Sequence, residues 1–275
     1  MKINYIIFSD LDGTLLDYHT YSFDDAIPAI KLVKKLNIPI ILVSSKTRLE
    51  LVYFQEQLDL KELPFVIENG AAIFTSISYF KTRANGEQIE DLYCYRFGKT
   101  YLEIKKILQK ISHDYNYNIK GYHNATPGEI SERTLLEGKL LIRSLSREFS
   151  VPLFYDSKAE EILKSEISKY NLQILYGGRF MHLLSKIDKG DALNFIMQGY
   201  RRKFKNKNLK SIALGDSLND FTMLARSDIP VLVKKFDGTY ETRGSLKNAH
   251  YTQQIGPRGW NQFIIEFLQQ GGING

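Results

Sequence analysis

Two short acidic clusters contain the residue types from which a catalytic site could be built. The first, Asp10-Leu11-Asp12-Gly13-Thr14, follows an apolar run and places two carboxylates two residues apart, beside a glycine and a hydroxyl. The second, Gly215-Asp216-Ser217-Leu218-Asn219-Asp220, also follows an apolar run. Carboxylates held close together repel one another, so a bound cation is a natural way to keep them ionised. Either cluster alone could equally be a turn or a helix cap.

Two further groups could supply the hydroxyl and the ammonium that such a site needs. Ser44 ends an apolar run, and Lys189 stands before Gly190 at the expected start of a helix. The helix dipole disfavours a lysine at this position unless an anion lies nearby. Lys186 is a competing candidate, and an ordinary lysine in a first turn is the alternative for Lys189. With the carboxylates, these groups describe a hard-cation site of the kind that magnesium prefers when it also holds a phosphate.

The apolar runs before these clusters are typical of buried strands. Residues 5–8, 39–43 and 65–67 alternate with helical patterns, and residues 211–214 and 230–233 continue the series. This alternation predicts an α/β fold with a parallel sheet and right-handed crossovers. Because ligands bind at the carboxyl ends of the strands in such sheets, we expect the polar clusters to lie at one edge.

The middle of the chain has a different pattern. Several helical patterns there are followed by a β-hairpin signal around Gly177 and Gly178, without the strand–helix alternation of the flanking segments. We therefore expect a discontinuous core, residues 1–81 and 187–275, interrupted by an inserted α+β domain at residues 82–186.

Composition limits the class of protein. A chain of 275 residues with 43% hydrophobic and 25% charged residues is typical of a soluble globular protein. No apolar run approaches the roughly 18 residues that cross a bilayer, and the first residues do not resemble a secretory signal. The lone cysteine, Cys94, cannot form an internal disulfide. We expect a cytoplasmic protein with no membrane partner, as a monomer or a homodimer.

The basic run from Arg201 to Lys210 suggests an alternative function. It contains an aromatic residue, Phe204, as patches that bind nucleic acid can. The run also lies at the expected end of a helix, where cations are favourable, so we expect a solvated helix end and no nucleic-acid partner. A regulatory protein without turnover is a second alternative, and the presence of both Asp10 and Asp12 argues against it.

The two acidic clusters, Ser44 and Lys189 resemble the four signature motifs of the haloacid dehalogenase (HAD) superfamily of phosphohydrolases, and they occur in the same order along the chain. Ser44 stands where threonine is usual and keeps the hydroxyl. The insert resembles the α/β cap of the sugar-phosphatase branch, and within that branch the chain resembles the mannosyl-3-phosphoglycerate phosphatase family. The stretches that carry this closer resemblance are Ser44-Ser45-Lys46-Thr47-Arg48, Glu68-Asn69-Gly70-Ala71, Thr126-Pro127-x-Glu129-Ile130, Arg147-Glu148-Phe149, Gly177-Gly178-Arg179-Phe180-x-His182-Leu183 and Gly256-Pro257-x-Gly259-Trp260-Asn261.

The resemblance implies a HAD-like Rossmannoid core with a cap, and a Mg²⁺-dependent phosphatase. The implied reaction converts mannosyl-3-phosphoglycerate into mannosylglycerate and phosphate through an aspartyl-phosphate. Glucosyl-3-phosphoglycerate and other sugar phosphates, such as sucrose-6-phosphate, are alternative substrates. In every case the implied partner is a small anionic sugar phosphate, which the formal charge of +6 suits.

The resemblance also implies roles for individual residues. Asp10 is the nucleophile and Asp12 the general acid and base, while Ser44 and Lys189 bind the transferring phosphoryl oxygens. The implied metal residues are Asp10, Asp12 (through its main-chain carbonyl), Asp216 and Asp220. The residues expected to bind the substrate are Thr14, Ser45, Lys46, Glu68, Asn69, Arg147, Arg179, His182 and Asn219. Taken singly, His182 is more often a packed strand histidine, and Arg147 could equally be a cation at a helix end.

Overall fold

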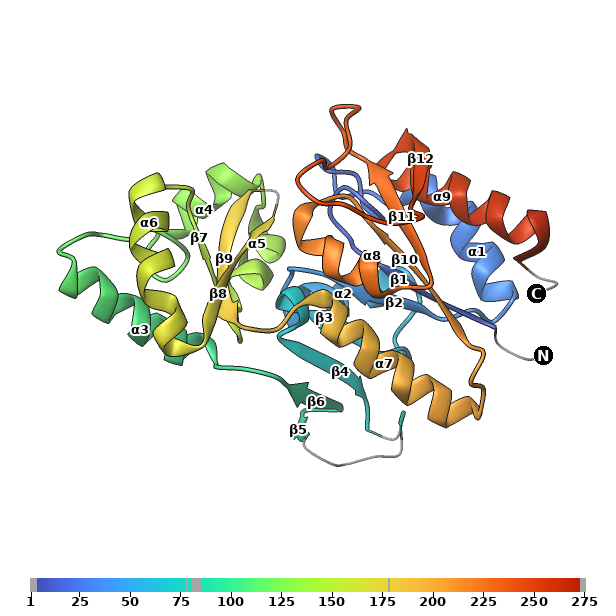
Figure 1. Cartoon of the computed structure of the whole chain (residues 1–275), viewed down its shortest axis with the longest axis horizontal. Helices are drawn as coiled ribbons and strands as arrows, with labels where there is room; N and C mark the ends of the chain where they lie inside the picture. The colour runs from blue at the N-terminus through green and yellow to red at the C-terminus, as the bar shows by residue number, and fades with distance from the viewer. Residues whose placement is uncertain (1–3, 78, 81–85, 178, 273–275) are drawn as a thin grey trace.

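The computed structural model describes residues 4–77, 79–80, 86–177 and 179–272. These residues form a large sheet with helices on both faces and a smaller α+β insert beside it (Figure 1). Gly178 and the predicted boundary at residues 81 and 82 lie outside the described residues. No helix in the described ranges is long and apolar enough to cross a membrane.

The large sheet has nine strands among the described residues, in the order β12-β11-β10-β1-β2-β3-β4-β6-β5. Neighbouring strands from β12 to β3 pair in parallel, and the pairs among β3, β4, β6 and β5 are antiparallel. The strands are β1 (Tyr5–Ser9), β2 (Ile40–Val43), β3 (Phe65–Ile67), β4 (Ala72–Ser76), β5 (Glu87–Ile89), β6 (Leu92–Arg96), β10 (Lys210–Gly215), β11 (Ile229–Lys234) and β12 (His250–Ile255). The parallel half confirms the predicted α/β fold.

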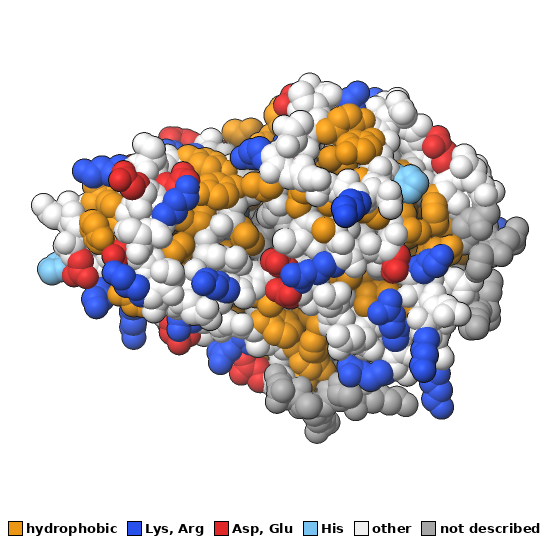
Figure 2. All heavy atoms as spheres, in the orientation of Figure 1, with side chains coloured by type: hydrophobic (Ala, Val, Ile, Leu, Met, Phe, Trp, Pro, Cys, Tyr) orange, Lys and Arg blue, Asp and Glu red, His pale blue; other side chains and the backbone are white. Residues whose placement is uncertain are grey.

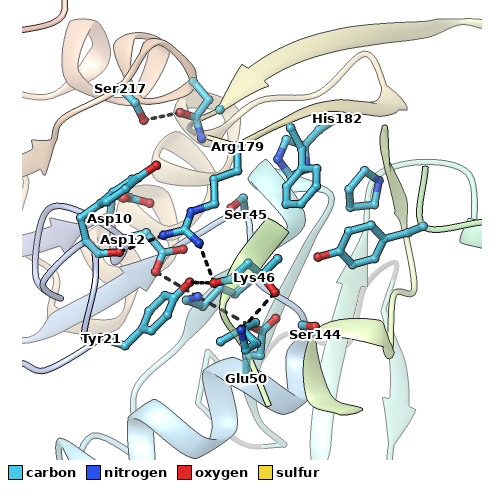
Figure 3. A pocket seen from close by; sticks show the side chains of 18 of the residues that line it. Asp10, Asp12, Tyr21, Ser45, Lys46, Glu50, Ser144, Arg179, His182 and Ser217 are labelled. Carbon is cyan, nitrogen blue, oxygen red and sulfur yellow. Dashed lines mark hydrogen bonds and ion pairs between the residues drawn. The ribbon is translucent and has the colours of Figure 1, made fainter. Parts of the chain in front are cut away.

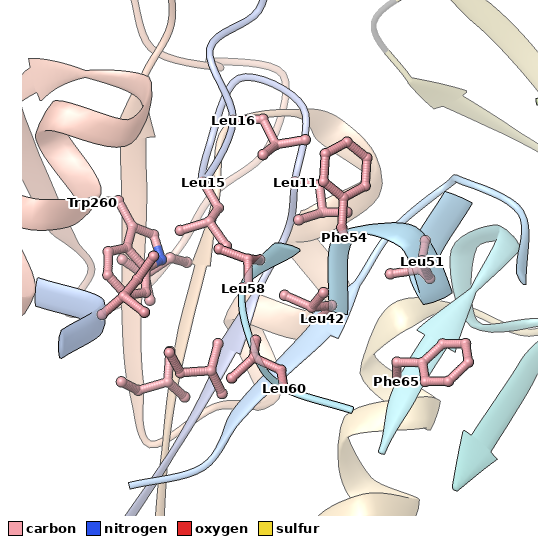
Figure 4. Packing of buried hydrophobic residues seen from close by; sticks show 14 of the residues in the cluster. Leu11, Leu15, Leu16, Leu42, Leu51, Phe54, Leu58, Leu60, Phe65 and Trp260 are labelled. Carbon is pink, nitrogen blue, oxygen red and sulfur yellow. The ribbon is translucent and has the colours of Figure 1, made fainter. Parts of the chain in front are cut away.

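Helices cover this sheet on both faces because side chains alternate along each buried strand. Ile7 of β1 packs into a core with the helices on one face, whereas Ile6 and Phe8 pack into a second core on the other. The first face is covered by α1 (Ile27–Lys35), α2 (Arg48–Gln57) and α9 (Gly256–Phe267), and the second by α7 (Lys189–Phe204) and α8 (Phe221–Arg226). Figure 4 shows part of the first core around Trp260, whose indole N–H donates to Ser9 Oγ at 3.0 Å.

The insert has its own sheet and its own core. Its three antiparallel strands lie in the order β7-β9-β8, namely β7 (Ser150–Leu153), β9 (Phe180–Ser185) and β8 (Leu172–Gly177). Two helices, α3 (Tyr101–Asp114) and α6 (Ser157–Glu166), pack against this sheet in one hydrophobic cluster. The shorter α4 (Pro127–Thr134) and α5 (Gly138–Leu145) pack in a second, smaller cluster, and α5 lies toward the large sheet (Figure 1).

The start of the insert differs from the prediction. Residues 86–96 were expected in the insert, but β5 and β6 extend the large sheet, and Cys94 of β6 pairs with Phe74 of β4 and is buried in the first core. The antiparallel hairpin adds strands to an edge without the strand–helix alternation that marks the core in the sequence. At the other end, β9 stops at Ser185 and α7 begins at Lys189, next to the predicted boundary at residue 187.

The basic run lies at the C-terminal end of α7, where residues 201–205 are exposed. Lysine and arginine side chains gather over this end of the helix in Figure 2. Cations at this position complement the helix dipole.

Candidate active site

The polar residues around Asp10, Ser44 and Asp216 meet at one edge of the large sheet because they follow three adjacent parallel strands, and Lys189 reaches the same edge from the first turn of α7. Asp10 follows β1 and Asp216 follows β10, and the two strands pair in register up to Ser9 and Leu214. The Asp10 N–H donates to Leu214 O at 2.9 Å, which fixes the exit of β1 against β10. Ser44 follows β2 on the other side of β1. The structure therefore places both acidic clusters at the carboxyl ends of neighbouring strands, where ligands bind in such folds.

Gly13 allows the first acidic loop to approach the second. Its φ of +78° lies in the left-handed region, and a β-carbon there would come within 2.8 Å of Asp216 Oδ2. A larger residue would therefore both strain the turn and displace Asp216. Thr14 Oγ1 lies 3.4 Å from Asp216 Oδ1, a long hydrogen bond that also joins the two loops.

Three buried carboxylates converge at this edge, those of Asp10, Asp216 and Asp220, with oxygens within 4.8 Å of one another. The Nζ of Lys189 lies 2.5 Å from Asp10 Oδ1 and 2.6 Å from Asp220 Oδ1. Lys189 is fully buried at the first turn of α7, and the cluster supplies the carboxylates that balance its charge. One ammonium against three carboxylates leaves an excess of negative charge.

Burial and the excess of negative charge shift the pKa values of two carboxylates in the cluster. Burial, together with the charge of Asp220, raises the pKa of Asp10 to about 7, although Lys189 opposes the shift. Burial and the charges of Asp220 and Asp10 raise the pKa of Asp216 well above its usual range. Burial alone would lower the pKa of Lys189, but Asp10 and Asp220 outweigh it and raise that pKa. The cluster therefore fits an additional cation.

Asp220 orders the second acidic loop. Its Oδ2 accepts hydrogen bonds from the Asp216 N–H at 3.1 Å and the Ser217 N–H at 3.0 Å, and its Oδ1 accepts one from Lys189. Both oxygens are therefore engaged by the protein. Asp220, one of the four residues expected at the metal, thus shapes the loop that presents Asp216 while its own carboxylate stays within the cluster.

Asp12 is not one of the three carboxylates of this cluster. Its Oδ1 lies 2.9 Å from the Nζ of Lys46, and its side chain is 35% exposed. Ser44 is buried, and its Oγ accepts from the Lys46 N–H at 3.3 Å. The two carboxylates of the first cluster thus have different surroundings, as their proposed roles require.

A cavity opens between the large sheet and the insert above these residues (Figure 3). The core contributes Asp10, Asp12, Ser45, Lys46, Asp216 and Asn219 to its lining. The insert contributes Arg147, Arg179 and His182. The lining also includes Tyr18, Tyr21, Glu50 and Tyr122, which sequence reasoning missed; Glu50 could have been found from the spacing Thr47-x-x-Glu50, which is that of a capping box.

The two arginines connect the insert to the core. Arg179 donates to Thr134 O at 2.6 Å within the insert and to Tyr18 O at 3.2 Å in the core, and its guanidinium lies over the Tyr18 ring. Arg147 donates to Ser45 O in the core at 2.9 Å. Arg147 also donates to Ser150 Oγ at 2.8 Å, and its Nε lies 3.4 Å from Glu68 Oε2. Because a guanidinium has five N–H donors, each arginine still has donors that can face a ligand.

Glu68 and Asn69 have surroundings that differ from the prediction. The Glu68 carboxylate is completely buried and accepts from the Glu148 N–H (2.7 Å), the Phe149 N–H (3.2 Å) and Ser150 Oγ (2.6 Å). Asn69 Oδ1 accepts from Asn219 Nδ2 at 2.9 Å. Neither residue lines the cavity, so their position does not support the expectation that they contact sugar hydroxyls. They join the insert and the second acidic loop to the turn after β3.

Backbone strain marks the same turn. Glu68, Asn69 and Gly70 have φ values of 47°, 62° and 99°, three consecutive residues in the left-handed region. A β-carbon at Gly70 would meet Asp188 O at 2.3 Å, just before Lys189. Non-glycine residues adopt this conformation at a cost of about 1–3 kcal/mol each, which the hydrogen bonds of Glu68 and Asn69 offset.

His182 is buried in the cavity wall on β9. Burial, with the charges of Arg147 and Lys189, lowers its pKa from 6.5 to about 3. Its Nδ1 has no hydrogen-bond partner among the described residues. A neutral imidazole facing a cavity can accept a hydrogen bond from a ligand hydroxyl.

We expect His182 to make the protein less stable in acid. Its pKa is lower in the folded than in the unfolded chain, so the unfolded chain binds the extra proton and stability falls as the pH drops from 6.5 toward 3. The contribution between pH 6.5 and 5 is about 1–2 kcal/mol. His182→Asn should flatten the pH dependence of the unfolding free energy by this amount.

The control for this prediction is His113→Gln, which changes an exposed histidine on α3. His123, whose pKa burial lowers to about 4, adds to the same slope and stays in both variants. An unchanged slope in His182→Asn, measured by denaturant unfolding at several pH values, would show that the buried histidine is not responsible.

Residues 7–239 match the haloacid dehalogenase-like hydrolase family. The chain belongs to this family, and it is a phosphoric monoester hydrolase.

Two relatives align with nearly the whole length of this chain. The glucosyl-3-phosphoglycerate/mannosyl-3-phosphoglycerate phosphatase of Methanococcoides burtonii is 36% identical over 269 residues, which cover 97% of this chain and 98% of the relative. A phosphatase of the same description from Persephonella marina is 36% identical over 268 residues, covering 96% and 97%. The fold matches a HAD phosphatase from Bacteroides thetaiotaomicron with a TM-score of 0.65 at 15% identity, over 98% of this chain and 96% of that one.

Proposed function

We propose that the protein is a Mg²⁺-dependent phosphatase that removes the phosphate from mannosyl-3-phosphoglycerate or glucosyl-3-phosphoglycerate. The observation that carries the proposal is the buried Asp10–Asp216–Asp220–Lys189 cluster at the base of a cavity with two arginines in its wall. The relatives named for both esters support the choice of substrate.

The carboxylates fit a divalent cation. Asp10 and Asp216, with the main-chain carbonyl of Asp12, would hold it, since oxygen ligands suit Mg²⁺. The raised pKa values of Asp10 and Asp216 support this assignment, because a cation removes the repulsion that raises them. When bound, the ion neutralises charge between the anionic nucleophile and the phosphate.

The chain's own residues would perform the transfer in two steps. An Asp10 oxygen forms a bond to phosphorus while the bond from phosphorus to the sugar-acid oxygen breaks, and Asp12 gives its proton to that oxygen. Water then attacks the aspartyl-phosphate and Asp12 takes a proton from it, which restores Asp10 and releases phosphate. Ser44 and Lys189 bind the phosphoryl oxygens through both steps.

The insert would select the sugar acid. Arg147 and Arg179 can pair with a carboxylate, a group that mannosyl- and glucosyl-3-phosphoglycerate carry and that simple sugar phosphates lack. His182 can accept from a sugar hydroxyl. Hydrogen bonds from these arginines to a substrate carboxylate contribute about 1.5–3 kcal/mol to the binding free energy. This difference separates esters with a carboxylate from simple sugar phosphates by roughly 10- to 100-fold.

A side-by-side measurement of phosphate release tests the proposal. We expect kcat/KM on mannosyl- and glucosyl-3-phosphoglycerate to exceed that on sucrose-6-phosphate, trehalose-6-phosphate and glucose-6-phosphate by at least about tenfold. Activity should disappear with a chelator and return with Mg²⁺. A preference for an ester without a carboxylate would overturn the substrate assignment and leave the phosphatase class intact.

A further inference from the structure

Lys46 is a buried lysine whose side chain is directed at Asp12. Its side chain is only 7% exposed, and its Nζ lies 2.9 Å from Asp12 Oδ1 and 3.6 Å from Glu50 Oε1 (Figure 3). The ammonium also lies over the Tyr21 ring, 4.7 Å from its centre. A substrate-binding role was expected for Lys46, yet its charge is already directed at two carboxylates.

Glu50 holds Lys46 in this orientation. Both residues lie at the start of α2, where Thr47 is the N-cap, and the Glu50 Oε2 accepts from the Thr47 N–H at 2.9 Å. The other oxygen of Glu50 faces Lys46. Because Glu50 is buried and one of its oxygens is fixed by the Thr47 N–H, it gives the ammonium a second, rigid carboxylate beside Asp12.

The insert holds both neighbours of Lys46. Ser45 O accepts a hydrogen bond from Arg147 at 2.9 Å. Thr47 Oγ1 donates to Arg143 O, at the end of α5, at 2.8 Å. The residues on each side of Lys46 are thus held by the insert, through the backbone of Ser45 and the side chain of Thr47, while the Lys46 side chain contacts the core residue Asp12.

We propose that Lys46 is a positioning residue for the general acid Asp12, and that the seated insert holds Lys46 in place for this task. The inference rests on the role proposed above for Asp12. A partly exposed carboxylate on a loop can turn toward water, and a fixed ammonium at 2.9 Å limits that freedom. Lys46 therefore acts on the leaving oxygen through Asp12, whereas Lys189 acts on the phosphoryl group and the nucleophile.

The test compares two leaving groups in Lys46→Met. An alkyl ester such as mannosyl-3-phosphoglycerate needs a proton on its leaving oxygen, whereas p-nitrophenyl phosphate releases a stable anion and does not. Since kcat/KM reports events up to the first irreversible step, we expect a fall of about 10²- to 10³-fold for the alkyl ester and less than about tenfold for the aryl ester.

Two matched variants show whether a loss in Lys46→Met acts through Asp12. Lys189→Met should lower kcat/KM for both esters by similar factors, because it acts on the transferring group. In an Asp12→Asn background, Lys46→Met should cause little further loss, since residues that act as a unit are not additive. An equal fall for both esters in Lys46→Met, no fall for either, or an independent further loss in the Asp12→Asn background would overturn the proposal.

The role of Lys46 and the identity of the substrate are tested by different measurements. The wild-type rates on the sugar-acid esters test the substrate assignment, and the ratio between alkyl and aryl esters can be measured with any alkyl phosphate that the wild type hydrolyses. Should Lys46→Met fail to fold, as judged by circular dichroism, Lys46→Gln removes the charge with a polar side chain and is judged by the same ratio.

Discussion

Asp10→Asn is expected to lower kcat/KM on every phosphate ester by about 10⁴-fold or more, because the amide has no anionic oxygen to attack phosphorus. The fold should survive. Asparagine has the shape of aspartate, its carbonyl can still accept from Lys189, and one charge is removed from a cluster with an excess of negative charge. We therefore expect the melting temperature of the metal-free variant to equal or exceed that of the wild type.

Phosphate release and thermal unfolding, measured on the same preparation, check both parts of this prediction. Asp59→Asn is the matched control, since Asp59 is exposed and has a φ of 53°, a conformation that asparagine tolerates well. Turnover within tenfold of wild type in Asp10→Asn would show that another group attacks phosphorus.

Lys189→Met is expected to reduce both activity and stability. The variant keeps the length of the side chain but leaves Asp10, Asp216 and Asp220 facing one another without the ammonium that contacts two of them. Breaking a buried pair in this way costs about 3–5 kcal/mol of unfolding free energy. Loss of a cation that stabilises the transferring phosphoryl group lowers kcat by about 10²- to 10³-fold.

Adding Mg²⁺ distinguishes the loss of stability from the loss of activity in Lys189→Met. The ion binds the folded carboxylates, so saturating Mg²⁺ should recover much of the lost stability by mass action while most of the activity remains lost. Denaturant unfolding with and without Mg²⁺, beside steady-state kinetics, measures this. Lys34→Met, which changes a partly exposed lysine paired with Asp59, should alter stability by no more than about 0.5 kcal/mol. A variant as stable as wild type without metal would contradict the charge balance argued for the cluster.

The parallel core could be predicted because its signals are local. Each strand is a short apolar run, and each acidic loop follows its strand directly, so the order of the chain already implies that Asp10 and Asp216 meet at one sheet edge. The contact of Lys189 with that cluster follows from its place at a helix start opposite the same edge.

Contacts between the core and the insert could not be predicted in the same way. Glu68 and Ser150 are far apart in sequence, and their hydrogen bond depends on how the insert sits on the core, which no local pattern records. The structure gives no support to the expected role of Glu68 in sugar binding, which came from the position of an acidic residue at a strand end. The contact of Asp12 with Lys46 is likewise not local, because the two residues follow different strands of the sheet.

The buried Glu68 also bears on the exchange of caps among relatives. A chimaera that kept this core and received another insert would place the Glu68 carboxylate against a foreign segment in place of Glu148, Phe149 and Ser150. Unless that segment offered backbone and hydroxyl donors at the same places, a charge would be buried without partners, which is strongly destabilising. Core and cap are therefore coupled at this one carboxylate: an incoming cap must supply donors equivalent to those of residues 148–150, or the glutamate must be replaced in the host.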